Sequence, residues 1–208
     1  MNNRVVKKVL ATMLAATLLT MPIVAGATDQ AEPAQTQEQK ETITPAATPI
    51  NAGGTVIKSD VPGAYSVGKT GSSGVTGFVV RQSTSALAQA AGLAKNEKPF
   101  VSAYDINAKK SPAAFASFQG AAAATGGTVM GGINVNLAKI AGGKLSELPA
   151  GTSVPATFAV SNKGGKTLAV AKVLPGGATE ILKDQDDNPN TVTVPITAGP
   201  AAYGIIGY

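Results

Sequence analysis

Hydrophobic and polar residues alternate most regularly near the C-terminus, in residues 191–197. Val192, Val194 and Ile196 fall on one face of this segment, whereas its threonines and Pro195 fall on the other. Strict alternation of this kind is typical of a half-buried β-strand. Because proline cannot donate a backbone hydrogen bond, we expect this strand to lie at a sheet edge or at a break in the pairing.

The rest of the C-terminal region follows the same pattern. The sequence predicts further strands at residues 154–160, 167–174, 178–183 and 201–208. Asn162-Lys163-Gly164-Gly165 and Pro175-Gly176 supply turn residues between them, so we expect consecutive hairpins that form an antiparallel meander. The last segment has no polar face, which predicts a strand covered on both sides.

Upstream segments predict two short helices between further strands. Ser83-Thr84-Ser85 is placed to cap the first helix, in which Leu87 and Ala91 stack one turn apart. Ser111 is placed to cap the second helix, Pro112 suits its first position, and a glycine pair at 126–127 can end it. We expect strands here at residues 78–81, 100–106 and 128–137. Residues 95–98 are expected to form a polar turn, and residues 145–151 a loop.

This pattern predicts a mainly β (α+β) fold, an antiparallel β-sandwich of the immunoglobulin-like kind. We expect about seven strands from residue 100 onward, because short strands separated by Gly- and Pro-containing turns are typical of sandwiches. Residues 53–208 are predicted to form a single β-rich domain. Within it, residues 98–208 are expected to be the sandwich core and residues 53–97 an N-terminal extension with the short strands 55–57 and 64–67.

The first 52 residues differ in composition from this domain. Residues 1–27 predict a signal peptide, because basic residues precede an apolar run that ends in Ala25-Gly26-Ala27. Residues 28–52 are rich in Gln, Glu, Thr, Pro and Ala, which predicts a disordered spacer. We therefore expect export, a mature N-terminus near Thr28, and no membrane span after cleavage.

Composition narrows the chemistry. The chain has neither histidine nor cysteine, so it lacks the usual general base near neutral pH and any disulfide or thiolate metal site. Its formal net charge is +5, yet no lysine cluster exceeds the pair Lys109-Lys110. Aromatic residues are not interleaved with a basic face either. We expect no nucleic-acid binding.

The acidic segment 184–188 is the candidate metal site. Asp184, Asp186 and Asn188 place side-chain oxygens at alternating positions, as calcium loops do. An EF-hand is excluded, since prolines occupy the positions where glycine and glutamate are required. The two alternatives are a looser calcium site and a polar connection in which Asp and Asn cap their own turns. No other cofactor is expected.

Catalysis by paired carboxylates is a more distant alternative. Glycoside hydrolysis uses two such groups, and sugar sites usually add stacking aromatic residues, but tryptophan is absent. We take an outward-facing Tyr65 or Tyr104 as evidence for glycan binding, and full burial of both as evidence for a structural role. The candidate carboxylates are Asp60, Glu97, Asp105, Glu147, Glu180 and the cluster at 184–187.

Several short motifs resemble those of a family of small secreted proteins from Gram-positive anaerobic gut bacteria. The motifs are Glu97-Lys98-Pro99-Phe100, Tyr104-Asp105-Ile106 with Lys109-Lys110-Ser111, the segment 184–192, and Ala202-Tyr203-Gly204-Ile205-Ile206. The resemblance covers residues 51–208. It implies export and an immunoglobulin-like β-sandwich, and it implies no reaction.

These observations favour a secreted, non-catalytic module with a structural or interaction role at the cell envelope or in the extracellular space. The alternative is a small module that binds glycan or calcium, followed by a hydrolase. The expected partners are a cell-wall polymer, a glycan or another surface protein. We expect any attachment to the wall to be non-covalent, because no sorting signal precedes the final Tyr208.

Overall fold

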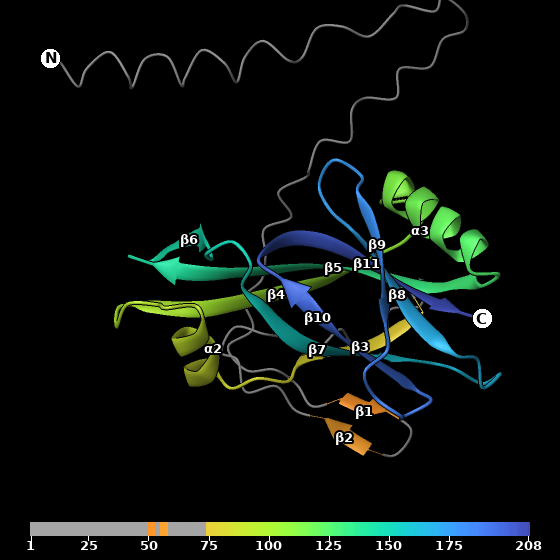
Figure 1. Cartoon of the computed structure of the whole chain (residues 1–208), viewed down its shortest axis with the longest axis horizontal. Helices are drawn as coiled ribbons and strands as arrows, with labels where there is room; N and C mark the ends of the chain where they lie inside the picture. The colour runs from red at the N-terminus through yellow and green to blue at the C-terminus, as the bar shows by residue number, and fades with distance from the viewer. Residues whose placement is uncertain (1–49, 53–54, 58–73) are drawn as a thin grey trace, which may run out of the picture. The chain divides into compact units, whose positions relative to one another are not determined.

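β-Strands make up most of the chain that the structure, a computed structural model, describes, namely residues 50–52, 55–57 and 74–208. All of these residues belong to one unit, Lys40–Tyr208. Two antiparallel sheets pack against each other through hydrophobic side chains, and two helices flank them (Figure 1). The mainly β architecture with two packed sheets is therefore confirmed. The immunoglobulin-like class stays a prediction.

The larger sheet has six strands and is built around the C-terminal strand β11. Its order is β4-β5-β11-β8-β9, and β6 pairs with the end of β5. The strands are β4 (Glu97–Ile106), β5 (Thr128–Ala141), β6 (Lys144–Glu147), β8 (Leu168–Val173), β9 (Thr179–Lys183) and β11 (Gly199–Gly207).

β11 is covered on both faces, as its apolar sequence predicts. Tyr203 and Ile205 pack into the core between the sheets, whereas Ala202 and Ile206 pack under a helix on the opposite face. Tyr208, which we expected with them in the core, is 50% exposed. It lies beyond the end of β11, where its backbone still pairs with that of Thr167.

The smaller sheet has three strands in the order β10-β7-β3. They are β3 (Val75–Val80), β7 (Ser153–Val160) and β10 (Thr191–Thr197). Pro195 lies in the edge strand β10, which confirms the position predicted from its missing backbone donor. It stands opposite Pro155 of the central strand.

β3 brings part of the expected N-terminal extension into the sandwich core. Phe78 packs against Phe158 with 5.2 Å between ring centroids, and Phe158 lies 5.6 Å from the Tyr203 ring. Leu87, from the first helix, joins the same buried cluster. The core expected from residue 98 onward therefore also includes side chains from before that residue.

A short ribbon precedes β3. β1 (Ile50–Ala52) pairs with β2 (Thr55–Ile57). The strand expected at 55–57 is confirmed, but its expected partner at 64–67 lies outside the described residues. β1 occupies the end of the spacer predicted to be disordered, so that prediction is wrong for these residues.

The helix α2 (Thr84–Ala90) has the N-terminal cap that its sequence predicts. The Ser83 hydroxyl accepts a hydrogen bond from the Ala86 N–H at 3.2 Å. Gly92 follows the helix with a φ of +62°, a conformation that glycine adopts without strain.

The helix α3 (Pro112–Ala124) begins and ends at the predicted residues, but its N-terminus lacks the predicted side-chain cap. Ser111 occupies the N-cap position without a side-chain cap bond. The Asn107 side-chain oxygen instead accepts from the N–H groups of Lys109 and Lys110, at 3.0 and 2.9 Å. Ser111 therefore takes the predicted position but not the predicted side-chain bond, and the asparagine closes a turn just before the helix.

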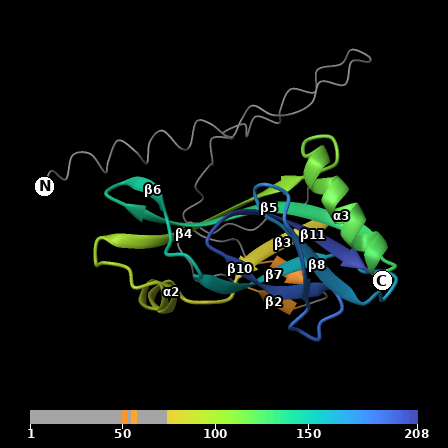
Figure 2. The ribbon, with the colours of Figure 1, turned by 45° about the horizontal axis from the view of Figure 1, so that its top comes forward.

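α3 lies on the face of the larger sheet that points away from the smaller sheet (Figure 2). Phe118 is fully buried there, on top of Gly132 of β5 and Gly204 of β11. The two glycines are cross-strand partners, and a Cβ atom at either one would collide with the Phe118 ring. The glycines thus form the floor on which the helix packs.

The meander predicted for the C-terminal region is wrong. β7 and β8 belong to different sheets, and so do β9 and β10. Alternation specifies which face of a strand is buried but not which strand lies beside it. Asn162 holds one of these crossings, because its side-chain NH₂ donates to the carbonyl groups of Lys166 and Pro189, at 2.8 and 2.7 Å.

Two local predictions also need correction. Residues 144–147 form β6 where we expected a loop at 145–151, so the described chain has one strand more after residue 97 than we expected. Glu97 and Lys98 belong to β4 and not to a polar turn. They pair with the end of β5, which continues to Ala141 instead of ending at residue 137.

Candidate functional site

The predicted metal-binding residues lie in the connection from β9 to β10, where they close a series of turns. The Asp184 carboxylate accepts a hydrogen bond from the Asp186 N–H at 3.0 Å, and Asp186 accepts from the Asn188 N–H at 2.9 Å. The Asn188 side chain repeats the arrangement with the Asn190 N–H at 3.0 Å. Each oxygen therefore satisfies a backbone donor two residues ahead.

The same carboxylates hold this connection against β10. Asp184 accepts from the Thr193 N–H at 2.9 Å, and the Gln185 N–H donates to the Thr193 carbonyl at 2.9 Å. Asp186 accepts from the hydroxyl groups of Thr191 and Thr193, at 2.8 and 2.6 Å. Hydrogen bonds to an ionised acceptor are among the stronger ones in proteins.

Every outward backbone donor of β10 is therefore bound. Thr191, Thr193, Pro195 and Thr197 are the residues whose backbone groups point away from β7. The N–H groups of the three threonines donate to Asn188, Asp184 and Tyr203 respectively. Pro195 has no donor to satisfy.

Burial of this connection changes the acidity of Asp184. Loss of solvent around the carboxylate raises the pKa of Asp184, and the charge of Asp186 adds to this effect. The backbone N–H groups of Thr193 and Asp186 act in the opposite direction, because they stabilise the ionised form. The net result is a pKa above the ordinary value of 3.8.

In the described part of the chain, no three acidic side chains come together as a group that could hold a metal ion. Asp184, Asp186 and Asn188 do lie close in sequence on one connection, and their oxygens bind backbone and threonine donors. The turn-capping alternative is thus present in the structure. Calcium binding by these three residues stays a prediction.

β9 is the edge strand beside this connection, and its backbone is not covered in the same way. The Leu174 N–H donates to the Ala178 carbonyl across the hairpin at 2.9 Å. Residue pairs in an antiparallel ladder alternate between hydrogen-bonded and non-hydrogen-bonded. Counting from this bond, the backbone N–H and C=O groups of Thr179, Ile181 and Lys183 point away from β8. Among the described residues, nothing accepts from or donates to these groups.

The side chains of β9 are also accessible. Ile181 is 41% exposed and lies opposite Ala171, on the face of the sheet that α3 covers. Sequence reasoning missed this edge because a Pro-Gly turn predicts the β8–β9 hairpin but not the absence of a further strand beside it. Only the strand order identifies β9 as the last strand of the sheet.

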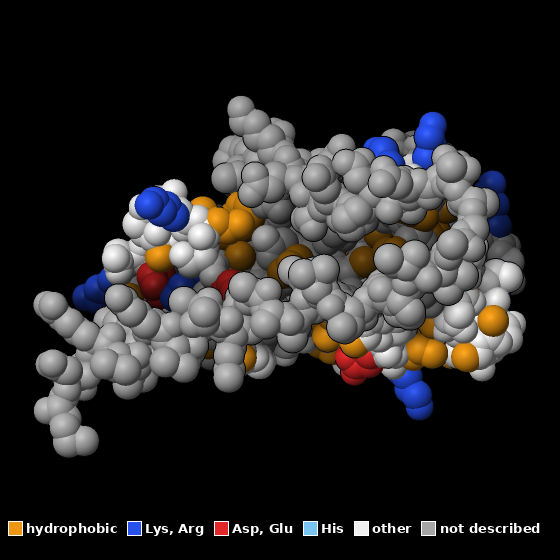
Figure 3. Space-filling view, turned by 90° about the horizontal axis from the view of Figure 1, so that it is seen from above, with side chains coloured by type: hydrophobic (Ala, Val, Ile, Leu, Met, Phe, Trp, Pro, Cys, Tyr) orange, Lys and Arg blue, Asp and Glu red, His pale blue; other side chains and the backbone are white. Residues whose placement is uncertain are grey.

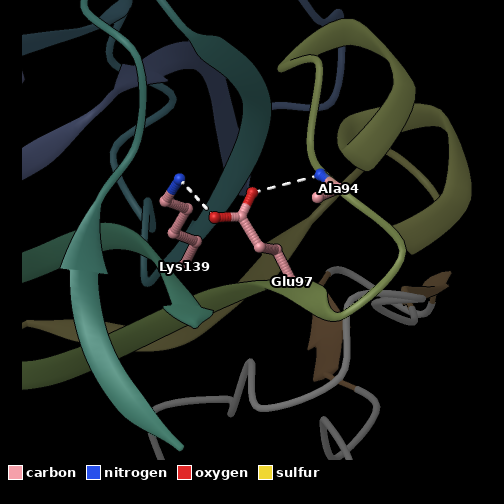
Figure 4. A network of polar contacts seen from close by, with 3 residues as sticks. All are labelled: Ala94, Glu97 and Lys139. Atoms are coloured by element: carbon pink, nitrogen blue, oxygen red, sulfur yellow. Dashed lines mark hydrogen bonds and ion pairs between the residues drawn. The ribbon is translucent and has the colours of Figure 1, made fainter. Parts of the chain in front are cut away.

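Two lysines hold candidate catalytic carboxylates. The Lys139 ammonium group bonds Glu97 at 2.8 Å, and the other Glu97 oxygen accepts from the Ala94 N–H at 3.1 Å (Figure 4). The bond to Lys139 is the main reason that the pKa of Glu97 is lowered. Lys172, whose side chain is 8% exposed, lies 3.5 Å from the carboxylate of Glu180.

The other candidate carboxylates are distributed over different elements. Asp105 lies in β4, with one buried oxygen that has no partner among the described residues, and Glu147 ends β6. Asp60 lies outside the described residues. The lysine and arginine side chains visible in Figure 3 are separated from one another and do not merge into one basic patch.

The exposure of Tyr104, which we take as a sign of glycan binding or of a structural role, is intermediate. Tyr104 is half-buried beside α3, and its hydroxyl accepts a hydrogen bond from the Asn134 side chain at 2.7 Å. It is thus neither fully buried nor fully outward-facing, and Tyr65 lies outside the described residues.

No helix in the described part of the chain is long and apolar enough to cross a membrane.

No protein-family model, curated protein or solved structure matches this chain.

Proposed function

We propose that the chain is an exported, non-catalytic β-sandwich module with an interaction role at the cell envelope or in the extracellular space. The observation that carries this proposal is the use made of its acidic groups. Asp184 and Asp186 hold a connection against β10, and Glu97 and Glu180 bind lysines. These groups bind other parts of the fold, whereas the outward backbone groups of β9 have no partner among the described residues.

Export rests on the sequence of residues 1–27 and on the resemblance to secreted proteins of Gram-positive anaerobic bacteria. Both support a protein that works outside the cytoplasmic membrane. A cell-wall polymer, a glycan or another surface protein is the partner class that fits such a location.

Two measurements test this function separately. The intact mass of the protein from culture medium should correspond to a chain that begins at or within a few residues of Thr28. The same protein should show no turnover of ester, peptide or glycoside substrates. A mass that retains residues 1–27 would contradict export. Reproducible activity that is lost on substitution of a single Asp, Glu or Ser would contradict the non-catalytic role.

A further inference from the structure

We propose that β9 pairs with β9 of a second copy of this chain, in an antiparallel arrangement that joins the two larger sheets. The proposal rests on the interaction role above and names its partner. It begins from the backbone of Thr179, Ile181 and Lys183, whose outward groups have no partner in the described residues. A free strand edge of this kind is a template for a further strand.

A second copy supplies a complementary strand by symmetry. When two β9 strands run antiparallel about a two-fold axis through Ile181, that residue stands opposite its own counterpart, and Thr179 stands opposite Lys183 of the second copy. All of these residues have outward backbone groups, so every donor of one strand meets an acceptor of the other. The two exposed isoleucine side chains cover each other beside α3.

The charges of β9 select this register. A slip by two residues in one direction places Glu180 opposite Glu180 of the second copy. A slip in the other direction places Glu180 opposite Asp184. The register centred on Ile181 instead places Glu180 opposite Leu182, and it brings no like charges directly opposite each other. Like-charge repulsion therefore disfavours the two nearest alternative registers.

The neighbouring edge strand does not offer the same surface. The outward donors of β10 are bound by Asp184, Asn188 and Tyr203, and Pro195 has none. Pairing between copies is therefore directed to β9 and not to β10. The resulting contact is a short one, which fits a dimer that dissociates on dilution.

Charge substitutions at the symmetry axis provide the sharpest test. Ile181→Glu and Ile181→Lys each place two like charges opposite each other across the axis. Each variant should dimerise about tenfold more weakly than the unchanged chain, or worse. An equimolar mixture of the two should recover the dimer, because Glu then faces Lys. Sedimentation equilibrium of the purified chain over a range of concentrations measures all of these states.

Leu174→Glu is the matched control. Leu174 is 39% exposed on the same hairpin but lies outside the proposed pairing, so this variant should dimerise like the unchanged chain. Circular dichroism should confirm that every variant is folded. A chain that stays monomeric at its highest soluble concentration overturns the proposal, as does a mixture that recovers no dimer. A monomeric result leaves export and the lack of turnover, measured separately, unaffected.

Discussion

β9 and β10 follow each other in the chain and are both edge strands, yet within the described part of the chain only β10 has its outward backbone donors bound. β10 carries a proline and receives the carboxylate of Asp184 at Thr193. β9 has neither feature, and Ile181 in its centre is 41% exposed. An uncovered edge invites association. The difference indicates that, among the described residues, β10 is protected against pairing with a further strand and β9 is not.

The connection between the two strands accounts for part of this difference. Residues 184–190 leave the end of β9 and fold back onto β10, where Asp184 and Asp186 bind Thr191 and Thr193. The turns that these acids close bring the connection close to β10 and away from the free side of β9. The strand order makes both β9 and β10 edge strands, and the turns of this connection cover β10 alone.

The largest expected effect on stability comes from replacing a buried residue of β10, compared with an exposed residue of β9. Ile196 of β10 is fully buried, so Ile196→Ala should lower the free energy of unfolding by about 2–5 kcal/mol. Ile181→Ala in β9 removes an exposed side chain and should cost less than about 1 kcal/mol. Urea denaturation of both variants, under conditions where the chain is monomeric, measures the difference. Equal losses would show that β9 is not the exposed edge described here.

A smaller effect is expected where the connection holds β10. Asp186→Ala removes the acceptor for two threonine hydroxyls and should destabilise the fold by about 2–3 kcal/mol. Asp187→Ala is the matched control, because Asp187 is exposed in the same connection. It should cost less than about 0.5 kcal/mol. Chemical denaturation distinguishes the two, and similar values for both would remove the proposed role of Asp186.

The sequence predicts the buried faces of the strands well. The alternation in 191–197 identified Val192, Val194 and Ile196 as core residues, and all three are fully buried. The apolar strand at the C-terminus is likewise covered on both sides. Burial of a face follows from the local pattern, because a strand exposes alternate residues to the same environment.

Strand pairing could not be predicted in this way. β7 and β8 are joined by a turn that contains Asn162 and two glycines, which is as compatible with a hairpin as with a crossing between sheets. The crossing depends on Asn162 and its bond to Pro189, a residue far away in sequence. The open edge of β9 depends on the same long-range order, so it was not predicted.

The sequence identified the residues of the candidate site, but it did not distinguish a calcium site from a series of capped turns. Alternating Asp184, Asp186 and Asn188 suit both a calcium loop and a series of turns. Their choice of donors depends on where β10 passes, since Thr191 and Thr193 supply part of the hydrogen bonds. That position is fixed by tertiary structure and not by the acidic segment alone.

The smallest expected effect concerns the charge of Asp184. The pKa of Asp184 is raised above its ordinary value of 3.8 by burial, so the folded state holds the proton more tightly than the unfolded state. Ionisation of this group therefore weakens the fold as the pH rises through the window that begins at this value. Asp184→Asn keeps an oxygen acceptor for Thr193 and removes the charge. It should match or exceed the unchanged chain at pH 7 by less than about 1 kcal/mol.

The difference should disappear as the pH falls below the ordinary value of the aspartate, because both proteins are then uncharged at residue 184. Glu97→Gln provides a control of opposite sign. The pKa of Glu97 is lowered by Lys139, so its charge stabilises the fold above its ordinary value of 4.5 and this contribution is lost as the pH falls through the lowered pKa. Glu97→Gln should therefore be less stable than the unchanged chain at pH 7. Urea denaturation between pH 3 and pH 7 measures both trends. A loss of stability in Asp184→Asn at pH 7 would mean that the ionised carboxylate holds β10 more strongly than its burial opposes.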